Sequence, residues 1–124
     1  FRQHGELHSL YDLGYEMQVA ILNYLREHDL PVIVLDAKRV LLDPPKVLSK
    51  LCDQLDIPFE SNMLQWKAGA RPEDGVWAKY WYKNVHQSIG FSPYQPKKES
   101  FPHHLTPLLT SAKPYYEQLV ELAI

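Results

Sequence analysis

The chain has 124 residues and a formal net charge of −2, with 45% hydrophobic and 23% charged residues. This balance is typical of one folded domain, or of part of one, and it excludes a disordered tail. Because nucleic-acid binding needs a concentrated cationic surface, no nucleic-acid partner is expected. The longest apolar run, PVIVL, is too short to cross a bilayer, and the single Cys52 cannot form an internal disulfide. We therefore expect a cytoplasmic protein without a membrane partner.

The first predicted element is an amphipathic helix that runs from about Ser9 to Glu27. Ser9 is a typical N-cap residue, because its hydroxyl can accept a hydrogen bond from a backbone N–H of the first turn. Apolar side chains recur along this stretch at three- to four-residue spacing, which places them on one face of the helix. These positions are Leu10, Leu13, Met17, Ile21, Tyr24 and Leu25.

The next segment, PVIVLDA, predicts a β-strand over Val32–Leu35, because it is continuously apolar and rich in β-branched residues. Such a strand is typical of the interior of a parallel sheet. Its backbone groups need neighbouring strands, and the sequence offers no second convincing one. The chain also begins at Phe1 rather than at a methionine. We therefore expect residues 1–124 to be part of a larger protein that supplies the rest of the sheet.

Helices are predicted again downstream of this segment. Asp43 is expected to cap a helix that begins at two prolines. The inner face of that helix holds Val47, Leu48, Leu51, Cys52 and Leu55. A short helix follows Ser61, another covers residues 76–88, and a last one covers about 106–124, where an internal proline bends or interrupts it. An exposed connector, SPYQPKKESFP, is predicted near residues 92–102.

Titratable side chains in the sequence indicate structural roles more than chemistry. The six histidines show no spacing typical of metal ligands, so no metal site is expected. Cys52 falls on an apolar helix face, which favours a buried structural thiol. Glu73 and Asp74 precede a predicted helix, where negative charge complements the helix dipole. His86 is the histidine to test as a base, although no catalytic residue is assigned.

The stretch WKAGARPEDGVWAKYWY, residues 66–82, combines cations with aromatic side chains. Lys67 and Arg71 fit either a phosphate clamp or a solvated loop. Helical spacing favours core packing for the aromatic stripe over a lid that stacks on a ligand ring. The stripe consists of Trp77, Tyr80 or Trp81, and Val85. Tyr82 lies off the stripe and is better placed to contact a ligand.

Two long blocks carry a family resemblance that covers nearly the whole chain from about Leu13 onward. They are VIVLDAKRVLLDPPKVLSKLCDQLDIPF and NMLQWKAGARPEDGVWAKYWY, and KPYYEQL fits the same pattern. The chain resembles the C-terminal half of P-loop sulfotransferases, most closely a bacterial-type branch. The resemblance implies a three-layer α/β/α domain. This chain would be its mostly helical C-terminal portion, with one parallel strand near Val32–Leu35.

The same resemblance implies an activity. Sulfotransferases move a sulfuryl group from 3′-phosphoadenosine 5′-phosphosulfate (PAPS) to a hydroxyl or amine of a small-molecule acceptor. By this resemblance Lys67, Arg71 and Tyr82 are the cofactor-binding residues. Arg71 takes the central position of the family's Arg-Lys-Gly element, whereas Ala70 and Pro72 depart from it. Lys67 would compensate from a position just upstream.

The sequence contains no strand followed by a glycine-rich phosphate loop. We therefore expect the N-terminal P-loop half of the domain to be a partner of this chain and the chain alone to be inactive. Lys38 and Arg39 stand where the family pattern expects a Glu-Asp pair. This departure leaves two rivals: a non-catalytic helical interaction module built on the same scaffold, and a P-loop small-molecule kinase relative.

Overall fold

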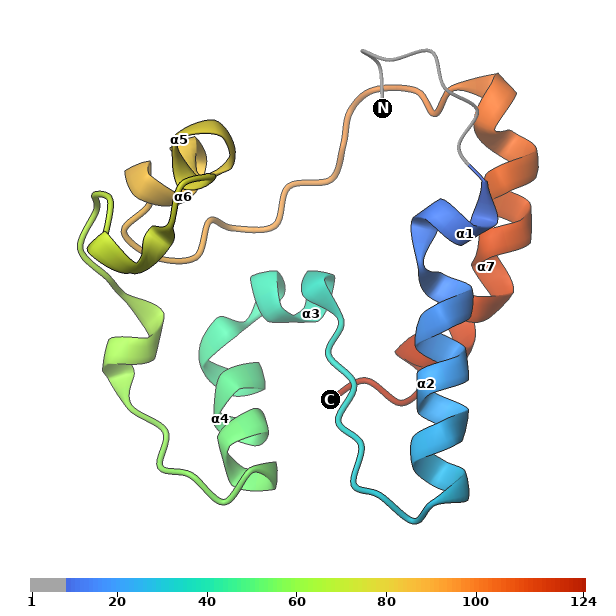
Figure 1. The fold of residues 1–124 in the computed structure, drawn as a ribbon, viewed down its shortest axis with the longest axis horizontal. Helices are drawn as coiled ribbons and strands as arrows, with labels where there is room; N and C mark the ends of the chain where they lie inside the picture. Colours follow the sequence, from blue (N-terminus) through green and yellow to red (C-terminus); the bar gives the residue numbers. More distant parts are fainter. Residues whose placement is uncertain (1–8) are drawn as a thin grey trace. The chain divides into compact units, whose positions relative to one another are not determined.

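The computed structural model describes residues 9–124, which fold into helices joined by extended connections (Figure 1). The described part divides into two compact units. The first unit combines the described residues up to Asp36 with Pro96–Ile124, and the second consists of Ala37–Gln95. The second unit is therefore inserted, along the chain, between the two parts of the first.

The expected α/β fold with a strand at Val32–Leu35 is wrong. Residues 9–124 contain no strand or sheet, and only Val34 in this segment pairs, through an isolated parallel bridge to Ala123. The N–H of Ile124 donates to the carbonyl oxygen of Val34 at 3.2 Å. A strand needs a ladder of successive pairs, and no second extended segment lies alongside to provide one within the described part. The β-branched composition gives an extended backbone but no sheet.

The first unit begins with two helices where one was expected. Helix α1 covers Leu10–Leu13 and helix α2 covers Tyr15–Glu27. The break is at Gly14, whose φ of 73° is left-handed and costs little without a Cβ atom. Ser9 caps α1 as predicted: its Oγ accepts the N–H of Asp12 at 3.4 Å, and the Asp12 carboxylate accepts the N–H of Ser9 at 2.7 Å.

The core of the first unit forms where α2 packs against α7, a helix covering Thr106–Val120 that follows the 3₁₀ turn η3, His103–Leu105. The two helices lie side by side and run in the same direction (Figure 1). Val19, Leu22 and Leu119 are buried at this contact. Tyr15, Val34 and Tyr115 pack around them. Pro114 lies inside α7 without ending it.

The second unit opens with α3 (Ala37–Leu42), which the sequence analysis did not predict, and α4 (Pro44–Gln54). The predicted cap of α4 is confirmed, because the Asp43 carboxylate accepts the N–H of Lys46 at 3.2 Å. Val47 and Cys52 are buried on its inner face, whereas Leu55, also expected there, is 50% exposed. The short helix predicted after Ser61 is the 3₁₀ helix η1, Ser61–Leu64.

The helix expected over residues 76–88 is not continuous. Its place is taken by α5 (Ala78–Trp81) and α6 (Lys83–Gln87), which follow the 3₁₀ turn η2, Pro72–Asp74. The expected packing of its aromatic stripe in a core is wrong, because these side chains are exposed within the described part. They are Trp77, Tyr80, Trp81 and Val85. Two helices of this length have no common face on which a stripe could pack.

No helix in residues 9–124 is both long enough and apolar enough to span a membrane.

Candidate functional site

The cationic and aromatic stretch lies in a loop whose two ends are paired. Gln65 and Gly90 form an isolated antiparallel bridge, and the N–H of Trp66 donates to the carbonyl oxygen of Ile89 at 3.1 Å. A Cβ atom on Gly90 would lie 2.9 Å from the backbone oxygen of Leu64, so the close approach needs glycine. We call residues 65–90 the closed loop.

The indole of Trp66 secures the base of the closed loop. Its Nε1 donates to the hydroxyl of Ser88 at 2.9 Å, and that hydroxyl donates to the carbonyl oxygen of Val85 at 2.7 Å. The Trp66 ring also meets the ring of Phe91 edge to face, with centroids 5.4 Å apart. This tryptophan is therefore structural, because its one polar atom and its ring face are both occupied.

His86 in α6 connects the far side of the closed loop to its cationic part. The backbone oxygen of His86 accepts the N–H of Gly69 at 2.8 Å. Its ring Nε2 lies 2.8 Å from Oδ2 of Asp74. The same Oδ2 accepts the backbone N–H of Arg71 at 2.7 Å. Residues 69–74 are therefore held at three points.

These contacts change the pKa of the Asp74 carboxyl group. Its pKa is lowered from the ordinary value of 3.8, first by the hydrogen bond from the backbone N–H of Arg71 and then by the hydrogen bond from His86. Both contacts favour the charged form of the acid. Asp74 caps the turn η2, whereas the single helix over residues 76–88 that it was expected to cap is not present. Its long-range partner His86 was not foreseen.

The predicted cofactor-binding residues occupy different parts of the closed loop. Lys67 and Arg71 are both exposed, and no ion pair engages either cationic group among residues 9–124. Tyr82, at the junction of α5 and α6, is 41% exposed. Its ring meets the ring of His86 edge to face, with centroids 6.0 Å apart. His86 thus lies between Tyr82 and the turn that contains Arg71.

An open pocket of about 380 Å³ adjoins this junction and is lined by Trp77, Trp81 and Tyr82. Trp77 is 66% exposed and Trp81 is 75% exposed. Aromatic faces of this kind can stack on a ring of a ligand or pack against a protein surface. The exposure of these side chains is therefore compatible with the alternative prediction, a lid that stacks on a ligand ring.

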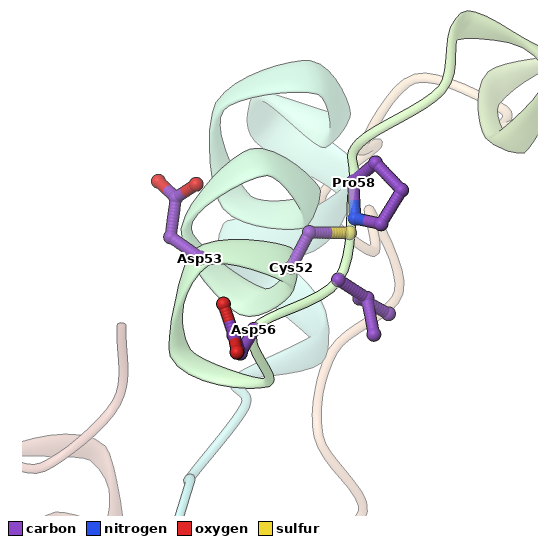
Figure 2. Close-up of a pocket in the computed structure, with 5 residues that line it drawn as sticks. Cys52, Asp53, Asp56 and Pro58 are labelled. Carbon is purple, nitrogen blue, oxygen red and sulfur yellow. The ribbon is translucent and has the colours of Figure 1, made fainter.

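A second pocket, of about 390 Å³, lies at the end of α4 and is drawn in Figure 2. It is lined by Cys52, Asp53, Asp56, Ile57 and Pro58. The thiol of Cys52 is buried beside Pro58 and lies 3.8 Å from the sulfur of Met63. The burial expected for the Cys52 thiol is confirmed.

A search of residues 9–124 for metal sites finds no group of three or more His, Cys, Asp or Glu side chains. The chemistry offered by the described part is therefore that of exposed cations and aromatic rings near one acid–imidazole pair. Such an arrangement can bind an anion or a planar group.

Comparison with known proteins gives the class of this chain. Residues 8–123 match the sulfotransferase domain family, so the chain belongs to that family. Two curated relatives from Arabidopsis thaliana are similar to it. They are branched-chain-amino-acid aminotransferase-like protein 1, 44% identical over 111 residues, and branched-chain-amino-acid aminotransferase-like protein 2, 40% identical over 111 residues. Each match covers 90% of this chain but only 20% of the relative. No solved structure matches the chain.

Proposed function

We propose that this chain is the C-terminal part of a P-loop sulfotransferase-like domain, which transfers a sulfuryl group from PAPS to a hydroxyl or amine. The family match over residues 8–123 is the observation that carries the proposal. The N-terminal P-loop half of the same domain would be the partner, and the chain alone would be inactive. A cytoplasmic location belongs to the proposal and rests on Cys52 being a free thiol.

The role proposed for this chain is to hold phosphate groups of the donor. When bound, PAPS would supply the sulfuryl group. The side chains of Lys67 and Arg71 fit this role, because both are exposed and neither forms a direct ion pair among residues 9–124. The charge of Arg71 is felt by Asp74, whose pKa it helps to lower. Arg71 would offer a planar fork of donors and Lys67 a point charge. Tyr82 would contact the donor through its ring.

The reaction would be an in-line displacement, with a base removing the acceptor proton and cations stabilising the phosphate groups. We assign only the second role to residues of this chain. Acceptor choice and the catalytic base would belong to other parts of the protein.

The names of the two relatives refer to aminotransferases, but this chain corresponds to one fifth of each. The matched segment is the part that fits the sulfotransferase domain family. We therefore do not extend an aminotransferase activity to the chain.

A titration of adenosine 3′,5′-bisphosphate into the full-length protein tests the proposal. Changing Arg71 to alanine removes one charge-assisted contact, and its loss should weaken binding about ten- to a hundredfold. Lys79→Ala is the matched control, because Lys79 lies over the ring of Tyr80, 4.9 Å from its centroid, and has no proposed contact with the nucleotide. Equal affinity of the wild type and Arg71→Ala would remove Arg71 from the site.

One observation favours a second candidate, the non-catalytic interaction module. Trp77, the N-cap of α5, and Trp81, four residues later, are both exposed and line one pocket, as they would on a surface that binds another protein. In such a module neither adenosine 3′,5′-bisphosphate nor ATP would raise the melting temperature. A rise with the bisphosphate supports the sulfotransferase, whereas phosphate transfer from ATP would support the kinase relative.

A further inference from the structure

His86 contacts the cation-bearing segment at two separate points. Its carbonyl oxygen accepts the N–H of Gly69, and its ring Nε2 bonds the carboxylate of Asp74. Gly69 and Asp74 enclose Arg71, and Lys67 lies two residues before Gly69. A single residue of α6 therefore holds both ends of the segment that carries Arg71.

The two hydrogen bonds of Asp74 have different reach. Its bond to the backbone N–H of Arg71 joins residues three apart, so it closes a local turn but fixes nothing beyond that turn. Its bond to His86 joins residues twelve apart and connects the turn to α6. Without the imidazole, the turn could keep its own shape and still change its direction relative to α6.

The imidazole of His86 and the carboxylate of Asp74 are partly shielded from solvent, which strengthens the hydrogen bond between them. Each side chain is 22% exposed, whereas the cationic residues that it would position are on the surface. Hydrogen bonds between partly buried groups are less weakened by water and salt than those of surface pairs. The Tyr82 ring against His86 further limits the orientations of the imidazole.

We propose that His86 is a positioning residue. Its imidazole, acting through Asp74, holds Lys67 and Arg71 in the orientation in which they meet the donor phosphates, and it does not itself touch the donor. This inference rests on the proposed function for its consequence in binding. The structural claim, that the imidazole holds residues 67–74 in place, does not depend on the proposed function.

Two substitutions of His86 separate a hydrogen-bonding role from simple bulk. In His86→Gln the side-chain amide nitrogen can reach about as far as Nε2, so the bond to Asp74 can be kept. In His86→Asn the amide stops one bond shorter and cannot reach the carboxylate. Both variants keep the backbone oxygen that accepts from Gly69. The matched control is His28→Asn, since His28 lies in the first unit and bonds the Tyr24 carbonyl oxygen of its own helix.

Two measurements on the full-length protein are compared for each variant. The first is hydrogen exchange of the peptide that covers residues 67–76, and the second is the Kd for adenosine 3′,5′-bisphosphate. We expect His86→Asn to exchange faster in this peptide and to bind about three- to tenfold more weakly, as the loss of one hydrogen bond allows. His86→Gln should restore both values, and His28→Asn should change neither.

The outcomes distinguish this inference from the proposed function. The positioning role would be overturned if residues 67–76 exchanged in His86→Asn at the wild-type rate. It would also be overturned if His86→Gln and His86→Asn exchanged equally fast and bound equally weakly. Faster exchange with an unchanged Kd would overturn its consequence for binding. If the wild type binds no nucleotide, the proposed function fails, and the exchange data alone decide whether His86 holds the segment.

If His86→Asn lowers the melting temperature of the whole protein, Asp74→Ala provides a second route. Asp74→Ala also removes the acceptor for the Arg71 N–H, so its exchange defect should be at least as large as that of His86→Asn. Adding His86→Asn to Asp74→Ala should increase the defect no further, because the bond between the two side chains is already lost. Additive defects would contradict the connection.

Discussion

At the scale of single residues, Asp74 couples the closed loop to pH. The pKa of its carboxyl group is lowered from 3.8 in the folded protein, first by the Arg71 backbone N–H and then by His86. The charged carboxylate therefore stabilises the folded state fully when the pH is above the pKa of Asp74 in the unfolded chain. This stabilisation is lost as the pH falls through the lower pKa of the folded protein.

We expect residues 67–76 to exchange faster as the pH is lowered below 3.8, after correction for intrinsic exchange. Asp74→Asn removes the ionisable group, so its corrected exchange should be independent of pH in this range. The measurement is hydrogen exchange of the two proteins at matched pH values. A pH dependence that persists in Asp74→Asn would assign the effect to another group.

At the scale of elements, the contact between α2 and α7 depends on Leu22, which is 2% exposed. Leu22→Ala should lower the free energy of unfolding by about 2–5 kcal/mol, because it removes buried methyl groups and leaves a cavity. The adjacent Ile21 is 52% exposed and is the matched control. Ile21→Ala should lower the free energy of unfolding much less than Leu22→Ala does. Denaturant unfolding of both variants checks this, and equal losses would contradict the packing described.

The elements also show what the sequence could predict. Ser9 and Asp43 were identified as caps because a cap depends on a few neighbouring residues. The extended segment around Val34 was mistaken for a strand, because pairing depends on a partner that composition does not reveal. Periodic aromatics predicted one helix over residues 76–88, but the chain breaks at Tyr82 and leaves the rings exposed.

The same reasoning applies to the candidate site. Lys67, Arg71 and Tyr82 were found by their chemical type and by resemblance. The pair formed by Asp74 and His86 was missed, although each residue had been considered alone. The signal was present in the sequence, but the twelve-residue separation gives no reason to pair them until the intervening turns are known.

At the scale of the whole molecule, the exposure of Trp77 and Trp81 bears on the proposed P-loop partner. The proposed P-loop half would bury Trp77 and Trp81, since large exposed apolar patches are uncommon on folded proteins. Hydroxyl-radical footprinting of the full-length protein should therefore modify them about as slowly as Trp66, which serves as an internal control. Much faster modification of Trp81 than of Trp66 would count against such a covering half.

The pairing of Gln65 with Gly90 has an evolutionary consequence. The two ends of the closed loop lie side by side. Residues between them could therefore be inserted, deleted or changed in charge during evolution without moving the helices on either side. Changes in nucleotide preference would then accumulate between these two anchors. Gly90 would remain fixed, because a Cβ atom there would lie 2.9 Å from the backbone oxygen of Leu64.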